Sequence, residues 1–377
     1  MTNSRERISG VDTAWLRMEH PTNPMMIVGV MMFERPLHAR DVKRVIRERF
    51  LAFRRFGQCA VQEPGGAWWQ DPPSLDLDQH VRVVRLPGKA GKRELEALVS
   101  RLASTPLDFS RPLWEFHLVE NYAGASALIA RIHHCYADGI ALIQVMLSLT
   151  HATAAGSLAP PAAAEEDAAP EPSADRWEQL LAPLAGALGN VKQLGRGLMA
   201  EGTRRKAMDF ATEAARLMLM GRDAETRFKG PLGPRKRAAW ADPLPLDEVK
   251  AVGKALGCSI NDVLLSMAAG ALRDYLRDKG DAVDGLEIRA IVPVNLRAAG
   301  EGRALGNHFG LVFLDLPIGM EHPLERLYEV RRRMQALKGS YQPLIALGLL
   351  NAVGYGPRSI QEQVTAMLGN SASAVMT

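Results

Sequence analysis

Two adjacent histidines are the residues of this chain best suited to chemistry. They open the stretch His133-His134-Cys135-Tyr136-Ala137-Asp138-Gly139. The apolar run 126–132 before it predicts a buried strand, and residues 140–150 after it have the spacing of a helix. Successive side chains of a strand point to opposite faces, so one histidine faces a given cavity while the other supports it. We expect His134 to be the working residue and His133 the supporting one.

Several kinds of chemistry compete for this stretch. Asp138 lies four residues after His134, so on a helical turn it would orient the imidazole as in a catalytic triad. Across a strand–helix junction the two need not meet, and Asp138 then holds the loop through a distant arginine. A metal site is not expected, because adjacent strand histidines diverge and no third nitrogen or sulfur ligand is evident. A Ser or Cys nucleophile is also disfavoured: Cys135 lies beside the histidines, but the chain has no Gly-x-Ser-x-Gly turn. A structural histidine pair, satisfied by backbone, is the remaining alternative.

Length and composition indicate an ordinary globular protein. With 377 residues, 47% of them apolar, two domains are the default expectation. The three cysteines are odd in number and widely spaced, which predicts reduced thiols and a cytosolic protein. Residues 1–7 lack the apolar core of a signal peptide, and no apolar run reaches the roughly 18 residues of a spanning helix. The net charge of +4 is mild, and no nucleic-acid partner is expected.

Strand and helix patterns alternate irregularly along the chain. Residues 25–33 are an apolar run that predicts a strand buried on both faces, and residues 112–119 predict a strand just before the one that carries the histidines. In the last third, a predicted helix ends at Gly257, and Ser259 caps the next one, which begins at Ile260. Because no regular strand–helix–strand rhythm is present, we predict mixed sheets of the α/β class flanked by helices.

The middle of the chain differs in composition from both sides. Residues 153–175 are rich in Ala, Pro and acidic residues and predict a linker. Residues 176–237 are mostly helical in pattern and contain thirteen Lys or Arg against six Asp or Glu. This basic segment either bridges the domains with a solvated face or docks on an anionic lipid surface. We therefore predict two domains, 1–152 and 237–377, joined by a linker and helical crossover over 153–236.

The histidine stretch resembles the signature His-His-x-x-x-Asp-Gly of the chloramphenicol acetyltransferase-like superfamily of CoA-dependent acyltransferases. That superfamily also includes the condensation domains of peptide synthetases. Further pieces, in the same order along the chain, are similar to the bacterial wax ester synthase/diacylglycerol acyltransferase family. These pieces are Pro112-Leu113-Trp114, Gly230-Pro-Leu-Gly-Pro-Arg235, Asn261-Asp262, Val292-Pro-Val-Asn-Leu-Arg297 and Leu305-Gly306-Asn307.

The resemblance implies a fold and a reaction. It implies two chloramphenicol acetyltransferase-like domains with an active-site tunnel between them, entered by acyl-CoA from one face and by the acceptor alcohol from the other. His134 would be the general base that takes the proton of a fatty alcohol or diacylglycerol hydroxyl, which then attacks the thioester directly. No covalent enzyme intermediate and no cofactor are implied, because acyl-CoA is itself a substrate.

Roles for the other motif residues follow from the same resemblance. Asn261, at a helix start, is expected to stabilise the oxyanion or, alternatively, to cap its helix. Asp138 is expected to pair with Arg297 rather than with His134, and Gly139 completes the motif at the site. Asp262, next to Asn261, is expected to give structural support. Pro112, Leu113 and Trp114 are expected to pack beneath the site.

Two other functions stay open from the sequence. A condensation-type or small-acceptor acyltransferase would share the histidine motif, and a non-catalytic lipid-surface protein could share the fold. The apolar substrates imply a cytoplasmic protein peripherally associated with the inner membrane or with lipid inclusions. Residues 371–377 resemble a strand cut before the family's Asn-Val-Pro-Gly-Pro turn, so we expect a C-terminally incomplete member.

Overall fold

The first half of the protein is built on a four-stranded sheet. The computed structural model describes residues 5–150, 201–297 and 305–377. The strand order is β2-β7-β6-β5, with β5 parallel to β6 and the other neighbours antiparallel. This is the mixed sheet that the sequence predicts. Its strands are β2 (Met26–Phe33), β5 (Val81–Val84), β6 (Trp114–Tyr122) and β7 (Ala125–His133).

The two strands nearest the histidines differ in burial. All nine residues of β7 are buried, because β7 has a neighbour on each side. β2 is an edge strand, and Met32 on it is 54% exposed. The prediction that residues 25–33 are buried on both faces is therefore wrong. An apolar run does not reveal that a strand lies at an edge, since strand order depends on contacts distant in sequence.

Helices and a small second sheet surround the first sheet. The helices are α1 (Gly10–Arg17), α2 (Ala39–Val45), α3 (Leu77–His80), α4 (Lys92–Ala103) and α5 (Gly139–Ser148), with single turns η1 (Ile46–Phe50) and η2 (Arg54–Gly57). The small sheet has the order β1-β4-β3, from β1 (Glu6–Arg7), β3 (Cys59–Glu63) and β4 (Gly66–Gln70). α5 follows the histidines as predicted, and it begins at Gly139, one residue before the predicted start.

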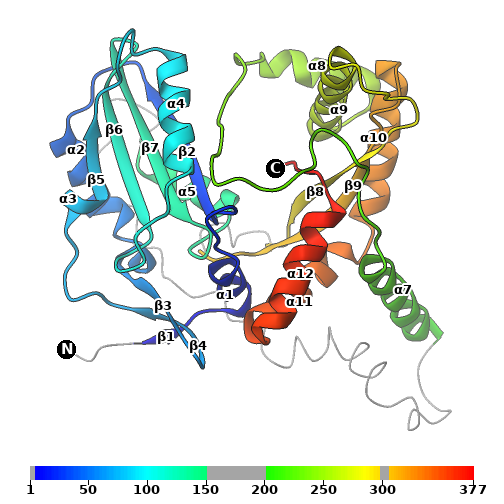
Figure 1. The fold of residues 1–377 in the computed structure, drawn as a ribbon, viewed down its shortest axis with the longest axis horizontal. Coiled ribbons are helices and arrows are strands. Elements are labelled where there is room, and N and C mark those ends of the chain that lie inside the picture. Colours follow the sequence, from blue (N-terminus) through cyan, green and yellow to red (C-terminus); the bar gives the residue numbers. More distant parts are fainter. Residues whose placement is uncertain (1–4, 151–200, 298–304) are drawn as a thin grey trace.

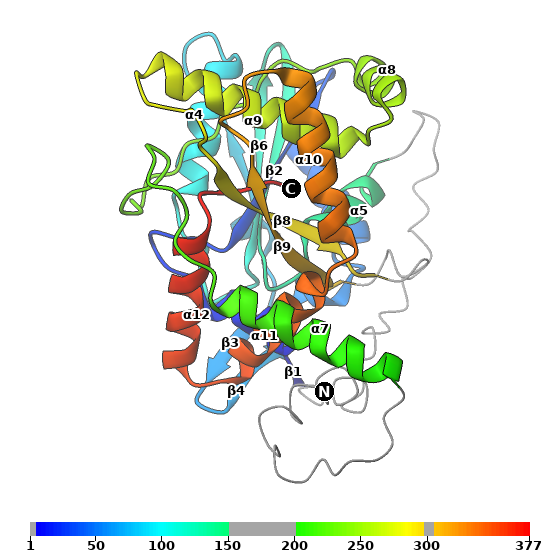
Figure 2. The ribbon, with the colours of Figure 1, turned by 90° about the vertical axis from the view of Figure 1, so that its right-hand side faces the viewer.

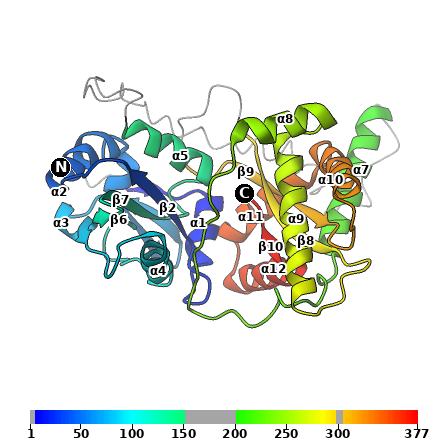
Figure 3. The ribbon, with the colours of Figure 1, turned by 90° about the horizontal axis from the view of Figure 1, so that it is seen from above.

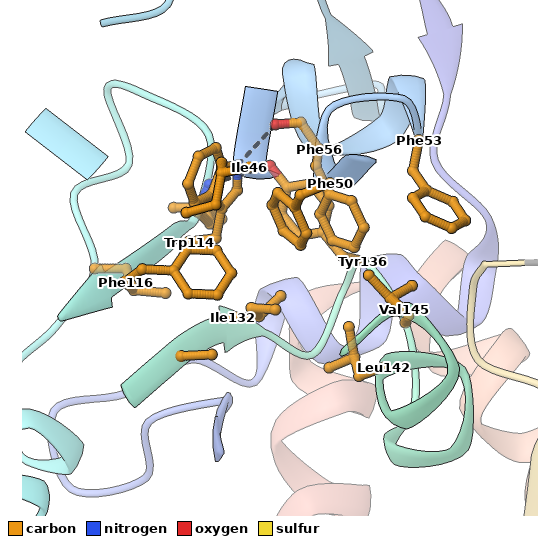
Figure 4. Packing of buried hydrophobic residues seen from close by; sticks show 14 of the residues in the cluster. Ile46, Phe50, Phe53, Phe56, Trp114, Phe116, Ile132, Tyr136, Leu142 and Val145 are labelled. Atoms are coloured by element: carbon orange, nitrogen blue, oxygen red, sulfur yellow. Dashed lines mark hydrogen bonds between the residues drawn. The ribbon is translucent and has the colours of Figure 1, made fainter. Parts of the chain in front are cut away.

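An aromatic cluster fills the core beneath the histidine stretch. Trp114 is fully buried, meets Phe50 edge-on, and donates from its indole Nε1 to the carbonyl of Phe56 at 2.7 Å (Figure 4). Tyr136 lies within the same cluster. Its hydroxyl accepts from the Leu113 N–H and donates to the backbone carbonyl of Gln58. A buried indole and phenol need such partners, so the cluster fixes the base of the loop.

The second half is also built on a mixed sheet flanked by helices, with three strands in the order β10-β8-β9. Its strands are β8 (Ile288–Asn295), β9 (Phe309–Leu316) and β10 (Ala374–Val375). Its helices are α7 (Glu201–Met218), α8 (Leu246–Leu256), α9 (Ile260–Asp278), α10 (Pro323–Lys338), α11 (Gln342–Tyr355) and α12 (Arg358–Ser371). Figure 2 shows α10 running beside the sheet and α7 lying across α11. The predicted helix boundary is present: Gly257 is left-handed (φ 65°) and Ser259 caps α9.

The two halves meet where α1 packs against α11 (Figure 1). The approach is close enough to require glycine, because a Cβ on Gly354 would lie 1.6 Å from the carbonyl oxygen of Gly10. A side chain at either position would push the helices apart. This contact sets the first turn of α1 beside the start of β9.

Residues 221–245 cross between the halves. The segment reaches α4, where the N–H groups of Lys236 and Ala238 donate to the hydroxyls of Ser104 and Ser100, and then returns to α8 (Figures 1 and 3). The predicted linker 153–175 lies outside the described residues. Within the described ranges no single helix is long and apolar enough to cross a membrane. The bent pair α8 and α9 passes that test by length and composition only.

Candidate active site

The loop after β7 holds the two histidines in different surroundings. β7 ends at His133, which pairs in register with Met26 on β2. The His134 N–H donates to the carbonyl of Met25 at 2.7 Å, while the His133 N–H donates to that of Leu113 at 2.9 Å. The loop backbone is thereby tied on both sides of β7, and the two rings leave it in separate directions.

The His134 ring lies between the two halves. It stacks on the indole of Trp15 in α1, with ring centroids 4.2 Å apart and planes 13° from parallel. Its Nδ1 is 2.8 Å from Oδ1 of Asn307, which precedes β9. The Asn307 Nδ2 donates to the carbonyl of His134 at 2.7 Å, so Oδ1 is the end of the amide that faces the ring. His134 Nδ1 must then carry the proton, which leaves Nε2 as a hydrogen-bond acceptor.

Burial controls the charge of this imidazole. Desolvation lowers the pKa of His134 from 6.5 to about 4, although the hydrogen bond with Asn307 raises it. The ring is consequently neutral at neutral pH and ready to accept a proton, but its protonated form is costly.

We expect His134 to stay neutral until the pH approaches 4. A lowered pKa means that the folded protein binds this proton only at more acid pH than the unfolded chain does. A pH titration of the ring ¹³Cε1 signals by NMR measures this, with the His134 signal identified by its absence from His134→Ala. Titration of that signal near 6.5 would contradict the buried environment described here.

His133 is a buried supporting residue. The ring is 1% exposed, and Nδ1 accepts from the Cys135 N–H at 3.1 Å. Nε2 therefore carries the proton and faces Oε2 of Glu19 at 3.5 Å. The ring meets Phe109 edge-on. These surroundings agree with the supporting role expected for His133 from the sequence, and this role stays a prediction.

Asp138 ties the histidine loop to the second half. Its Oδ2 accepts from Arg297 Nη1 at 2.6 Å and from the His308 N–H at 3.1 Å. Its Oδ1 accepts from the Ala141 N–H, which caps α5. Both side chains of the ion pair are nearly buried, at 5% and 3% exposure. The predicted pairing of Asp138 with Arg297 is thus present, and the alternative of Asp138 orienting His134 is not supported by a hydrogen bond between them.

The remaining predicted site residues lie in three places. Gly139 opens α5, and a Cβ built on it would meet no atom within 4 Å, so open space adjoins it. Asn261 is exposed in the first turn of α9. Its neighbour Asp262 forms a capping box with Ser259, a structural task. The oxyanion role of Asn261 stays a prediction. Pro112, Leu113 and Trp114 are buried at the start of β6.

Sequence reasoning missed three residues of this site. Asn307 entered only as part of a motif, and Trp15 and Asp12 did not enter at all. Asp12 accepts from Asn307 Nδ2 at 2.6 Å. The Ser-x-x-Asp pattern at residues 9–12 is typical of a helix start. It gives no sign that the Asp12 side chain contacts Asn307, which is 295 positions away in the sequence.

The overall fold and the position of the histidine can be compared with solved structures. Two halves with mixed sheets meet at a histidine that follows a central strand of the first half and is held by a residue of the second. This two-part fold is shared with solved structures. The solved wax ester synthase/diacylglycerol acyltransferase from Marinobacter aquaeolei VT8 is similar over 97% of this chain and 80% of its own, with a TM-score of 0.60 and 22% identity. The first condensation domain of the calcium-dependent antibiotic synthetase is similar over 99% and 79%, with a TM-score of 0.55 and 16% identity. At these identities, the two similarities show a shared fold only.

Sequence comparisons narrow the class to one family. Residues 8–264 match the wax ester synthase/diacylglycerol acyltransferase catalytic domain, and residues 305–377 match the WS/DGAT C-terminal domain. A putative diacylglycerol O-acyltransferase of Mycobacterium tuberculosis is 33% identical over 341 residues, which cover 88% of this chain and 73% of that protein. A probable diacylglycerol O-acyltransferase of the same species is 29% identical over 368 residues, covering 93% and 78%. The chain belongs to the wax ester synthase/diacylglycerol acyltransferase family of acyltransferases.

Proposed function

We propose that this protein transfers a fatty acyl group from acyl-CoA to the hydroxyl of a long-chain alcohol or a diacylglycerol, with His134 as general base. The observation that carries the proposal is the hydrogen bond between His134 Nδ1 and Asn307 Oδ1. It leaves Nε2 unprotonated on a neutral ring, the state in which an imidazole takes a proton from an alcohol. The stacked indole of Trp15 keeps the ring plane fixed.

The steps follow from the chemistry of a thioester. His134 Nε2 takes the hydroxyl proton as the oxygen attacks the thioester carbonyl. The carbon–sulfur bond then breaks, and the departing CoA thiolate receives the proton from the imidazolium. Asn261 is the predicted donor to the oxyanion in between. Asp138 and Arg297 hold the loop that carries the base.

The test is product formation from palmitoyl-CoA with hexadecanol or a diacylglycerol of matched chain length. We expect one mole of wax ester or triacylglycerol for each mole of CoA released, and the ratio of the two rates gives the acceptor preference. If no acceptor causes release of CoA, the alternative of a non-catalytic lipid-surface protein with this fold would be favoured. Release only with amine acceptors would favour the condensation-type alternative.

We further infer that the protein works at the surface of a membrane or lipid inclusion. α7 presents large apolar side chains to solvent, with Met208 70% and Leu219 just beyond the helix 82% exposed. The surrounding basic segment has thirteen Lys or Arg against six Asp or Glu over residues 176–237. Each cation near an anionic surface contributes about 1 kcal/mol at most, and salt screens it.

We therefore expect reversible, salt-sensitive binding to anionic phospholipid vesicles. Charge reversal at Arg204, Arg205 and Lys206 should weaken sedimentation with the vesicles and leave turnover of a short, soluble alcohol unchanged. A matched triple charge reversal at Lys89, Arg93 and Arg101, on and before α4, should bind as the wild type does. Equal binding by both variants at low salt would leave the basic segment as a bridge between domains.

A further inference from the structure

Asp12 is a buried carboxylate whose side chain leaves its own helix. Ser9 caps α1 by accepting from the Asp12 N–H at 3.1 Å. The Asp12 side chain also reaches beyond α1, where its Oδ1 accepts from Asn307 Nδ2 at 2.6 Å. Asp12 is 8% exposed and Asn307 5%. The side chains of Asp12 and Asn307 therefore form a buried line that leads to the partly exposed His134 imidazole.

The amide in the middle of this line has two unequal ends. Asn307 Nδ2 faces two acceptors, Asp12 Oδ1 and the carbonyl of His134, at 2.6 and 2.7 Å. A rotated amide would point its oxygen at both acceptors and its NH₂ at the ring nitrogen. An ionised carboxylate has no proton to donate, so that arrangement leaves buried acceptors facing each other, which is costly.

The charge of Asp12 suits this task. Burial raises the pKa of the Asp12 carboxyl to about 6, although hydrogen bonds from Asn307 and Ser9 lower it. The group is consequently ionised, and able only to accept, above that pH. A negative charge two hydrogen bonds from the imidazole also favours the imidazolium that burial disfavours.

We propose that Asp12 is a positioning residue for acyl transfer: it holds the Asn307 amide so that His134 keeps its proton on Nδ1 and presents Nε2 to the acceptor hydroxyl. This inference rests on the proposed function, because it assigns Asp12 to the base of that reaction. Asp12 touches neither substrate and acts through Asn307. The line also requires both halves of the protein, since α1 and the start of β9 each supply a member.

A purely structural role for Asp12 is the competing explanation. An acidic residue at the third position of a helix stabilises the helix start whatever it faces. Glu94 occupies the same position in α4, where its Oε2 accepts from the Gly91 N–H at 2.9 Å. Glu94→Gln is therefore the matched control: the same change from carboxylate to amide at the same helix position, away from the histidine.

The experiment uses the full chain labelled with ¹⁵N-histidine. The wild type should show His134 protonated at Nδ1 and bare at Nε2, with signals assigned by difference from His134→Ala. Asp12→Asn should give a mixture of tautomers and lower kcat by about 10–10³-fold, less than the roughly 10⁴-fold loss known for a carboxylate bonded directly to its histidine. The KM for palmitoyl-CoA should not change. Glu94→Gln should keep the wild-type tautomer and kcat.

Two outcomes would overturn the inference. Asp12→Asn with the wild-type tautomer and kcat would do so, and so would a loss of activity that matches the unfolded fraction with the tautomer intact. Asp12→Ser, measured in the same way, serves as a second variant if Asp12→Asn folds poorly. Failure of the proposed function looks different: His134→Ala would then turn over like the wild type, whatever Asp12 does.

Discussion

Replacing His134 with alanine is expected to lower turnover by about 10²–10⁴-fold, the range for losing a general base. Asn307 and the stacked Trp15 hold the His134 ring in place and leave its Nε2 as a hydrogen-bond acceptor, which is the proposed base. The fold should survive, because His134 follows β7 and its side chain is only partly buried. Acceptor-dependent release of CoA at saturating palmitoyl-CoA measures the loss, with circular dichroism to establish folding.

His133→Ala is the matched control for this measurement. It removes the neighbouring ring, which is 1% exposed and accepts from the Cys135 N–H. The variant should lose stability and keep more activity per folded molecule than His134→Ala. Near-normal activity in His134→Ala, with His133→Ala inactive, would reverse the assignment of the two histidines.

Removing either partner of the Asp138–Arg297 pair is expected to lower the free energy of unfolding by about 3–5 kcal/mol, because a charge then stays buried without its partner. The 2.6 Å contact joins side chains that are 5% and 3% exposed. Asp138 also accepts from two backbone N–H groups, so its loss disturbs both the cap of α5 and the link to the second half. Urea unfolding of Asp138→Ala and Arg297→Ala measures the effect, and both variants should also lose activity.

The double variant decides whether the two residues act as a pair. We expect the combined loss to be smaller than the sum of the single losses, which a double-mutant cycle reports as coupling. The exposed pair Asp247 and Lys250 on α8 provides the control, since such pairs contribute little. Additive losses at 138 and 297 would mean that the contact contributes no stability of its own.

Elements with local signals were predictable from the sequence. Gly257 and Ser259 mark the end of α8 and the start of α9, because a left-handed residue and a capping hydroxyl act within one turn. The central strand β7 is buried throughout, and most of its residues are apolar. The apolar sequence of β2 predicts a buried central strand as well, but β2 lies at the edge of the sheet and its apolar Met32 is exposed.

Contacts between the halves were predictable only through the family resemblance. That resemblance supplied the pairing of Asp138 with Arg297, 159 positions apart. It did not supply the line from Asp12 to His134, because Asp12 reads locally as a helix-start acid. The low pKa of His134 was also beyond sequence reasoning, since desolvation depends on what packs around the ring.

Direct attack by the alcohol, without an acyl-enzyme, is the central claim of this mechanism. Cys135, the residue after His134, is completely buried. Burial raises the pKa of the Cys135 thiol well above its usual range, so the thiolate that would attack a thioester is disfavoured. This argues against an acyl-cysteine intermediate at this position and agrees with the proposal that the alcohol is the proton donor to His134 Nε2.

A single-turnover reaction with radiolabelled palmitoyl-CoA tests that claim most directly. Enzyme in excess is mixed with the thioester, first without and then with a fatty alcohol or diacylglycerol, and CoA, free ester and protein-bound label are counted. We predict no release of CoA and no label on the protein until the acceptor is added, and then one ester for each CoA. A burst of CoA without acceptor, with the acyl group retained on the denatured protein, would contradict direct transfer.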